Sequence, residues 1–297
     1  MNFLSPAEVA AATANTGKAK SVMPFAKLFI MGILAGVYIG FGANLATTVG
    51  AGWTAEWANS GLNKFAFGAV FSVGLMMVVI GGSELFTGNN MFLTISALNG
   101  QATWGGLLYN WIVVWIANFV GSLILVGIVY AGSYYGNAEA LSAIGVKAVA
   151  IAKGKLGLTW GEAFFRAIGC NWLVCMAVWL AVAAKDVIGK IFACFFPIMA
   201  FVTSGFEHSV ANMYFVPMGI KIATSNPDAV VAAESLGMAS PDAVNALFNY
   251  GNFFMNNLIP VTLGNIVGGA LFVAGFYWFV FLKKDGASAS ASKSAKA

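Results

Sequence analysis

Long stretches without a charged residue alternate with short charged segments along most of this chain. The uncharged stretches cover residues 28–55, 65–83, 85–138, 167–184, 191–206 and 243–282. A helix needs about 20 mostly apolar residues to cross a bilayer, so stretches of this kind predict membrane-spanning helices. Residues 85–138 are too many for one span, and Gly100, Gly105 and Gly106 indicate a turn among them. We therefore predict six spans, at about residues 25–49, 64–98, 105–134, 157–185, 188–223 and 249–281.

Composition supports an all-α integral membrane protein. The 297 residues are 60% hydrophobic and 9% charged, with a mean hydropathy of +0.82. A soluble domain carries about 25% charged residues, so this chain has too little polar surface to remain in water. Its net charge of +4 is spread along the sequence, which excludes a nucleic-acid-binding surface. The three cysteines lie in apolar stretches without zinc or disulfide spacing, so they predict packing positions and no metal site.

The two ends of the chain differ from the spans. Residues 1–23 contain Ser5-Pro6-Ala7-Glu8, a capping box with proline in the first turn, and predict a short amphipathic helix on the cytoplasmic membrane surface. No lysine precedes Lys18, so this segment is not a signal peptide. Residues 24–282 form the predicted six-span domain. The Ser/Ala/Lys-rich residues 283–297 predict a disordered cytoplasmic tail.

Lysine and arginine in the loops indicate the orientation of the chain. Six spans put both termini on one side of the membrane. That side carries Lys18, Lys20, Lys27, Lys185, Lys190, Lys283, Lys284, Lys293 and Lys296. The other side carries Lys64, Lys147, Lys153, Lys155, Lys221 and Arg166. The excess of positive charge favours both termini in the cytoplasm, with the protein in the inner (cytoplasmic) membrane.

Two sets of residues recur in the two halves of the chain at equal spacing. In spans three and six, Asn110, Asn118 and Gly121 match Asn257, Asn265 and Gly268. In spans two and five, Gly82, Glu84 and Asn89 match Gly205, Glu207 and Asn212. The order of these matches indicates that spans 1–3 are duplicated as spans 4–6. Because each half has an odd number of spans, we expect the two copies to lie inverted in the bilayer.

The second match falls where spans two and five are richest in Gly, Ser, Thr and Asn. Residues 81–90 and 203–212 predict unwound backbone, which a membrane tolerates only beside a cavity or within protein. A broken helix exposes the N-terminus of its second half, whose free N–H groups and positive dipole attract anions. Two such breaks near the midplane form a solute site in many transporters. The alternative is that the glycines only allow helices to pack closely.

Three ionisable residues lie within these breaks. Glu84 and Glu207 occupy equivalent positions, so we predict a shared structural role, with Asn89 and Asn212, in which the carboxylates accept hydrogen bonds from the unwound backbone. His208 has Leu85 as its counterpart in the first half. An unmatched titratable group at a pseudo-symmetric centre indicates function, and the alternative is a core histidine with satisfied hydrogen bonds.

At these residues the chain resembles the formate/nitrite transporter family. The matching segments, found within about residues 17–282, are 82–89 (GSELFTGN), 169–175 (GCNWLVC), 204–212 (SGFEHSVAN) and 258–265 (LIPVTLGN). The resemblance implies an aquaporin-like protomer with broken helices two and five. It also implies a homopentamer in the lipid bilayer, and one pore per protomer for small monovalent anions.

The same resemblance implies roles for individual residues. His208 resembles the central pore histidine, Thr87 its partner, and Asn171 the pore-facing asparagine of span four. The outer constriction is matched by Phe71 and Phe201, and the inner one by Leu75, Leu85, Phe86 and Val174. Lys155 matches the basic residue of the outer vestibule and Lys27 that of the inner one. We expect the anion to acquire a proton with the help of His208 and Thr87, because neutral passage through a dry constriction costs less than charged passage.

The substrate stays open among formate, nitrite and hydrosulfide, with formate slightly favoured. An aquaporin-like channel for neutral solutes is the alternative of a different class, but the paired Asn-Pro-Ala elements expected of it do not occur in this sequence. One histidine, without HExxH or GxSxG, argues against an enzyme, and no cofactor is expected.

Overall fold

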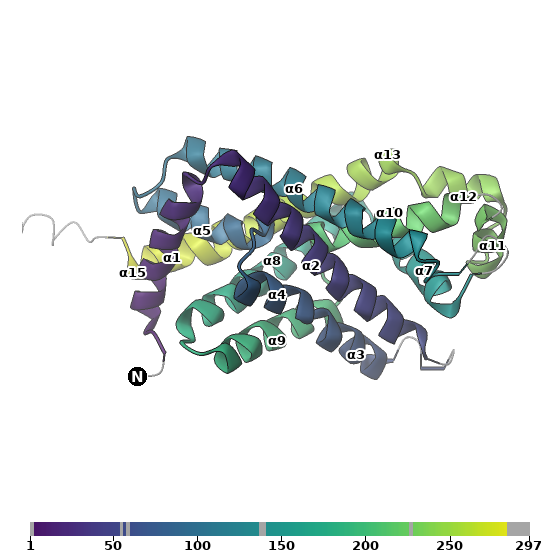
Figure 1. Ribbon diagram of the computed structural model, residues 1–297, viewed down its shortest axis with the longest axis horizontal. Coiled ribbons are helices and arrows are strands. Elements are labelled where there is room, and N and C mark those ends of the chain that lie inside the picture. The colour runs from purple at the N-terminus through teal and green to yellow at the C-terminus, as the bar shows by residue number, and fades with distance from the viewer. Residues whose placement is uncertain (1–2, 54–55, 58–59, 137–140, 226–227, 284–297) are drawn as a thin grey trace, which may run out of the picture.

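The computed structural model describes residues 3–53, 56–57, 60–136, 141–225 and 228–283, and the regular structure in these ranges is helical apart from two isolated β-bridges (Figure 1). Within them, five helices are long and apolar enough to cross a membrane: Phe25–Ala51, Gly61–Gly81, Trp104–Ala131, Trp160–Ala183 and Pro241–Phe281. The helix Val187–Thr203 is apolar but shorter. The prediction of an all-α fold built from apolar helices is confirmed.

The first half of the chain contains six helices. They are α1 (Pro6–Ser21), α2 (Phe25–Ala51), α3 (Gly61–Phe71), α4 (Val73–Gly81), α5 (Phe86–Leu98) and α6 (Trp104–Ala131). The predicted capping box starts α1: the Ser5 side chain accepts from the Glu8 amide, and the Glu8 carboxylate accepts from the Ser5 amide at 2.7 Å. One face of α1 is buried, and Gly17 on that face lets the helix contact the backbone of α5, since a Cβ there would lie 1.9 Å from the Phe92 carbonyl oxygen.

The second half begins with a helix that the sequence did not predict. The elements are α7 (Ala143–Leu156), α8 (Trp160–Ala183), α9 (Val187–Thr203), α10 (Ser209–Thr224), α11 (Asp228–Ser235) and α12 (Pro241–Leu247). The last apolar segment contains α13 (Tyr250–Asn252), η1 (Phe253–Leu258), α14 (Ile259–Ile266), η2 (Val267–Gly275) and α15 (Phe276–Phe281), where η marks π-helical turns. Like α1, α7 directly precedes a long apolar helix, so it extends the correspondence between the two halves.

Close contacts between backbones join helices within each half. A Cβ on Gly36 of α2 would lie 2.1 Å from the Asn118 carbonyl oxygen, and one on Gly121 of α6 would lie 2.1 Å from that of Ile33. In the second half, Gly264 and Gly268 allow the same approach to α8. These glycines allow the close helix packing that small residues support in membrane proteins.

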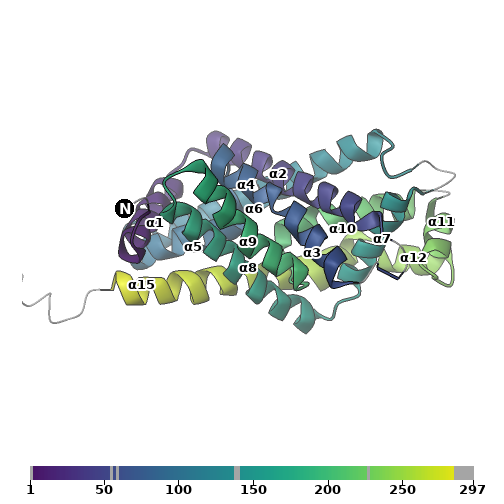
Figure 2. The ribbon, with the colours of Figure 1, turned by 90° about the horizontal axis from the view of Figure 1, so that it is seen from below.

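The described ends of the chain lie together. Figures 1 and 2 show α1 and α15 at one end of the long axis, and α7, α11 and α12 at the other. Leu4 and Val9 share an apolar cluster with Trp179 and Tyr277, which ties the N-terminal segment to α8 and α15. Of the predicted tail 283–297, residues 284–297 lie outside the described residues. We call the two ends of the molecule the α1 side and the α7 side.

Candidate functional site

Two glycines in the left-handed conformation begin the helix breaks. Gly82 follows α4 with φ 78°, and Gly205 follows α9 with φ 73°. A Cβ on either glycine would meet no atom within 4 Å, so neither glycine is required for close packing. Left-handed backbone disfavours every residue with a side chain, so these glycines turn the chain out of the helix. This finding supports the prediction of unwound backbone over the packing alternative.

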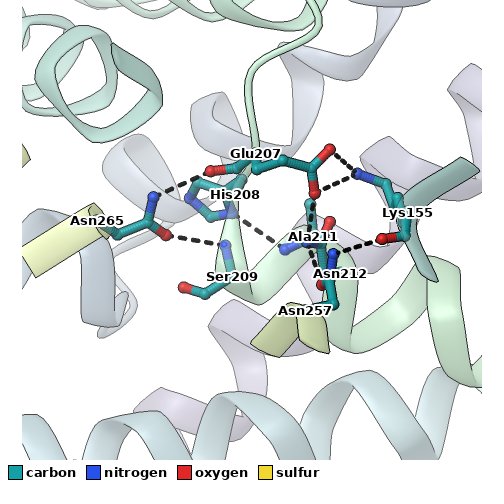
Figure 3. A network of polar contacts seen from close by, with 8 residues as sticks. All are labelled: Lys155, Glu207, His208, Ser209, Ala211, Asn212, Asn257 and Asn265. Carbon is teal, nitrogen blue, oxygen red and sulfur yellow. Dashed lines mark hydrogen bonds and ion pairs between the residues drawn. The ribbon is translucent and has the colours of Figure 1, made fainter. Parts of the chain in front are cut away.

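A polar network holds the break between α9 and α10 (Figure 3). The Lys155 ammonium of α7 lies 3.0 and 3.1 Å from the two carboxylate oxygens of Glu207. Asn212, in the second turn of α10, donates to the same carboxylate at 2.7 Å and to the Asn257 side chain at 2.7 Å. Asn257 in turn donates to the Lys155 carbonyl at 3.0 Å. The network thus connects α7, the break, α10 and η1.

Asn265 satisfies the unwound backbone of this break (Figure 3). Its side-chain oxygen accepts from the Ser209 amide at 2.9 Å, and its side-chain nitrogen donates to the carbonyls of Glu207 and Ala167 at 3.0 and 2.9 Å. Asn265 is fully buried, and buried backbone groups are costly to leave without partners. One amide side chain therefore binds two backbone groups at the break and the start of α10, and one of the neighbouring helix α8.

The break between α4 and α5 contains the same network. Lys20 of α1 pairs with Glu84, Asn89 donates to that carboxylate at 2.8 Å and to Asn110 at 2.8 Å, and Asn110 donates to the Lys20 carbonyl at 3.1 Å. Asn118 takes the place of Asn265: its oxygen accepts from the Phe86 amide at 2.9 Å, and its nitrogen donates to the carbonyls of Gly32 and Glu84. Even the aromatic ring under each lysine is matched, Phe92 under Lys20 and Phe215 under Lys155.

These contacts correct one prediction about the glutamates. Their carboxylates accept from a lysine and an asparagine side chain, and the backbone of each break is bound instead by Asn118 or Asn265. The predicted structural role of Glu84, Glu207, Asn89 and Asn212 agrees with these contacts. The equal spacing of Asn118 and Asn265 in the two halves was the sequence signal for these residues, but spacing alone does not show which groups they bind.

The basic residue beside Glu84 is Lys20, which the sequence did not predict as a site residue. Lys27 lies in the first turn of α2, where its side chain is exposed, and it takes part in no ion pair recorded for the described residues. Lys20 and Lys155 each end the helix that precedes a long apolar helix, so their equivalence follows from the match of α1 with α7.

His208 and Thr87 meet between the two breaks. The His208 Nε2 atom lies 3.0 Å from Thr87 Oγ1, and Nδ1 accepts from the Ala211 amide at 3.0 Å, so the ring caps the N-terminus of α10. Because Nδ1 is an acceptor in this contact, the proton of a neutral ring lies on Nε2 and is donated to Thr87. The Thr87 hydroxyl hydrogen is then free for another acceptor. Both side chains are buried.

Two cavities approach this pair from opposite sides. The α7-side cavity has a volume of about 120 Å³, and His208, Lys155, Phe71 and Phe201 line it. The Phe71 and Phe201 rings meet edge to face with centroids 6.0 Å apart, and Phe201 stacks on the His208 ring at 5.9 Å. The geometry therefore brings together the two aromatic residues predicted for the outer constriction.

The α1-side cavity is larger, at about 260 Å³. Leu75 and Leu85, both predicted for the inner constriction, line it together with Lys20 and Glu84. Phe86 does not line it: its ring packs against Trp111 on α6 and borders a separate apolar groove. Val174 is buried in the core, and the α8 residues that line the cavity are Val178, Ala181 and Val182.

Asn171 lies behind the Thr87 backbone. Its side-chain nitrogen donates to the carbonyls of Thr87 and Asn265 at 3.1 and 2.7 Å and to the Asn90 side chain at 3.1 Å. It is fully buried and lines neither cavity. The predicted pore-facing residue thus joins the start of α5 to the end of α14, beside the site.

Comparisons with known proteins agree with this architecture. The family model described as formate/nitrite transporter matches residues 7–279. The probable formate transporter of Methanothermobacter thermautotrophicus is 46% identical, with 95% of this chain and 99% of that protein covered. The formate channel FocA of Escherichia coli K12 is 35% identical, with 96% of each chain covered. A solved pentameric formate channel with formate bound is 38% identical, with a TM-score of 0.74 over 87% of this chain and 98% of that one.

Proposed function

The chain belongs to the formate/nitrite transporter family, and we propose that it conducts formate with a proton across the cytoplasmic membrane. The proposal includes a homopentamer of aquaporin-like protomers, each with six spans in an inverted 3+3 repeat and both termini in the cytoplasm. The pentamer is supported by the solved pentameric formate channel that this chain resembles. The repeat is supported by the matched networks of the two breaks and by the shared end of α1 and α15.

The observation that carries the proposal is the contact of Thr87 with His208 between two cavities. Each residue belongs to the start of a different half-helix, α5 or α10. Helix N-termini attract anions through free N–H groups and the positive end of the dipole. An anion that reaches Thr87 and His208 therefore lies near the N-termini of both α5 and α10, and the Thr87 hydroxyl hydrogen is available to bind it.

Protonation of the anion lowers the free-energy cost of its passage through the apolar constrictions. Transfer of a carboxylate-sized ion from water to a dry, low-dielectric environment costs on the order of 20 kcal/mol in the ideal limit. Protonation of an acid with a pKa of about 3.5 at pH 7 costs about 5 kcal/mol. The neutral acid therefore crosses between Phe71 and Phe201, or between Leu75 and Leu85, far more readily than the anion.

We assign the proton transfer to His208. A second proton on the ring must take Nδ1 away from the Ala211 amide, so the imidazolium forms at the expense of a contact that orders α10. A formate bound at Thr87 offsets the new positive charge. Transfer of the Nε2 proton from imidazolium to formate gives formic acid and a neutral ring that carries its proton on Nδ1. The contact with the Ala211 amide forms again once that proton has moved to Nε2.

The test is flux into proteoliposomes containing the purified protein, with formate, nitrite, hydrosulfide and glycerol compared from pH 5 to pH 8. We expect pH-dependent formate flux that His208→Gln makes far less sensitive to pH. Thr87→Val removes the hydroxyl and lowers flux, Thr87→Ser restores it, and Thr94→Val, a buried threonine further along α5, leaves it unchanged.

Three outcomes would overturn parts of this proposal. An unchanged pH profile in His208→Gln would remove the histidine from proton transfer. Preferred flux of nitrite or hydrosulfide would replace formate as the substrate. Glycerol flux without anion flux would move the protein to the channels for neutral solutes.

A further inference from the structure

The two cavities differ at residues that the repeat makes equivalent. The spacing that matches Glu84 to Glu207 also matches Ser83 to Phe206 and Lys190 to Phe67. Ser83 and Lys190 line the α1-side cavity, and the two phenylalanines line the α7-side cavity. Polar groups therefore occur on the α1 side at two positions where the other side is aromatic.

Ser83 has an unused hydrogen-bonding group. It is 8% exposed, and its hydroxyl has no partner among the described residues. A buried polar group without a partner is costly, so such a group indicates a missing contact. A serine hydroxyl moves among three staggered positions, which lets it turn toward the cavity that Ser83 borders.

Lys190 supplies a positive charge without a carboxylate partner. Its ammonium donates to the Ala181 carbonyl at 3.0 Å, and it takes part in none of the ion pairs recorded for the described residues. An ammonium has three donors, so two remain after this contact. The carbonyl also holds the lysine at the cavity wall.

The charges that line the two cavities are consequently unequal. On the α1 side, Lys20 and Glu84 offset each other and Lys190 adds one positive charge. On the α7 side, Lys155 and Glu207 offset each other, and His208 is uncharged while its Nδ1 accepts from the Ala211 amide. A cavity with one uncompensated positive charge and low-dielectric walls concentrates small anions.

We propose that the α1-side cavity contains a binding subsite for a small monovalent oxyanion, formed by the Lys190 ammonium and the Ser83 hydroxyl. The subsite lies on the path of the proposed function and rests on it. It holds the anion before that anion reaches Thr87 and His208, and it has no equivalent on the α7 side. Anions entering from the α1 side therefore saturate the pore at lower concentrations than anions entering from the α7 side.

One-sided flux of formate tests this asymmetry. Right-side-out and inside-out vesicles give entry from each side, and an impermeant maleimide on Lys18→Cys identifies the α1 side, because the three native cysteines are buried. We expect Lys190→Met to raise the half-saturating formate concentration about tenfold for entry from the α1 side, and Ser83→Ala about threefold. Entry from the α7 side keeps its half-saturating concentration.

Matched variants separate the subsite from general effects. Lys18→Met removes one positive charge from the same side at an exposed position outside the cavity, and we expect no change. Lys190→Arg keeps the positive charge, so we expect its half-saturating formate concentration for entry from the α1 side to stay close to that of the wild type. Size-exclusion profiles identify any variant that fails to fold, and Lys190→Arg and Ser83→Ala then carry the test.

The outcomes distinguish this inference from the proposed function. Absence of anion flux in the wild type from either side would overturn both. Wild-type flux with Lys190→Met and Ser83→Ala unchanged would overturn the subsite alone. An equal effect of Lys18→Met and Lys190→Met would also overturn it, since the effect would then come from net charge.

Discussion

The break between α4 and α5 and the break between α9 and α10 share their supporting contacts and differ in their chemistry. Lysine, glutamate and two asparagines form the same network at both. In contrast, Thr87 has Val210 as its equivalent, and His208 has Leu85. Each break thus contributes one partner of the central pair. The comparison teaches that the repeated residues hold the backbone open, while the unmatched residues give the site its hydroxyl and its titratable ring.

The largest expected effect comes from removing the asparagine that binds each break. Asn265→Leu leaves the Ser209 amide and the Glu207 carbonyl without this partner, at about 2 kcal/mol each. We expect a large drop in the thermal unfolding temperature in detergent, and a similar drop for Asn118→Leu. The exposed Asn256→Leu is the control. A much smaller loss at one break than at the other would end their structural equivalence.

Removing one lysine from its ion pair gives the next effect. Lys155→Met leaves the buried Glu207 carboxylate with one partner fewer and costs about 3 kcal/mol, as does Lys20→Met for Glu84. The double variant Lys155→Met/Glu207→Gln regains part of that loss, because no unpaired charge remains buried. Unfolding temperatures of the single and double variants measure this coupling. Additive losses would show that the pair does not act as a unit.

The two glycines that begin the breaks test backbone conformation alone. In Gly82→Ala and Gly205→Ala, the added Cβ meets no neighbouring atom within 4 Å. We therefore expect each variant to lose about 1 kcal/mol of unfolding free energy, which is the cost of positive φ for alanine. Chemical denaturation in mixed micelles measures the difference in unfolding free energy between each variant and the wild type. Gly36→Ala, where the added atom would contact backbone, is the steric comparison. A loss at Gly82 as large as at Gly36 would contradict the open surroundings of the break.

The smallest expected effect is a difference between α1 and α7 in how their stability depends on pH. Hydrogen bonds from the Ser5 side chain and backbone lower the pKa of Glu8 below its usual value of 4.5. The stabilisation of α1 by Glu8 is therefore present above that value and is lost as pH falls through the lowered pKa. Helix α7 is capped by Ser142 and has Gly145 in place of the acid. Hydrogen exchange at pH 3.5 and pH 7 should show added opening in α1 only; equal opening would remove Glu8 from its cap.

Local patterns predicted much of this architecture. The uncharged stretches gave the apolar helices, the capping box gave the start of α1, and the Gly-rich segments gave the two breaks. They missed α7, whose three lysines kept it out of the uncharged stretches, and the π-helical turns η1 and η2. The constriction residues Phe86 and Val174, which the family resemblance implied, line neither cavity, because a matching motif does not fix the direction in which each side chain points.

The sequence by itself determined the apolar helices, the family, the matched spacing of residues in the two halves and the unmatched His208, because hydropathy, spacing and motifs are properties of the linear chain. Only the tertiary structure decided that Lys20 and Lys155 pair with the glutamates, that Asn118 and Asn265 bind the open backbone, and that Ser83 and Lys190 share one cavity. These partners lie 32 to 107 residues apart in the chain, and their meeting depends on how the helices cross. Burial makes each contact necessary, since a carboxylate or amide removed from water must find its partners within the protein.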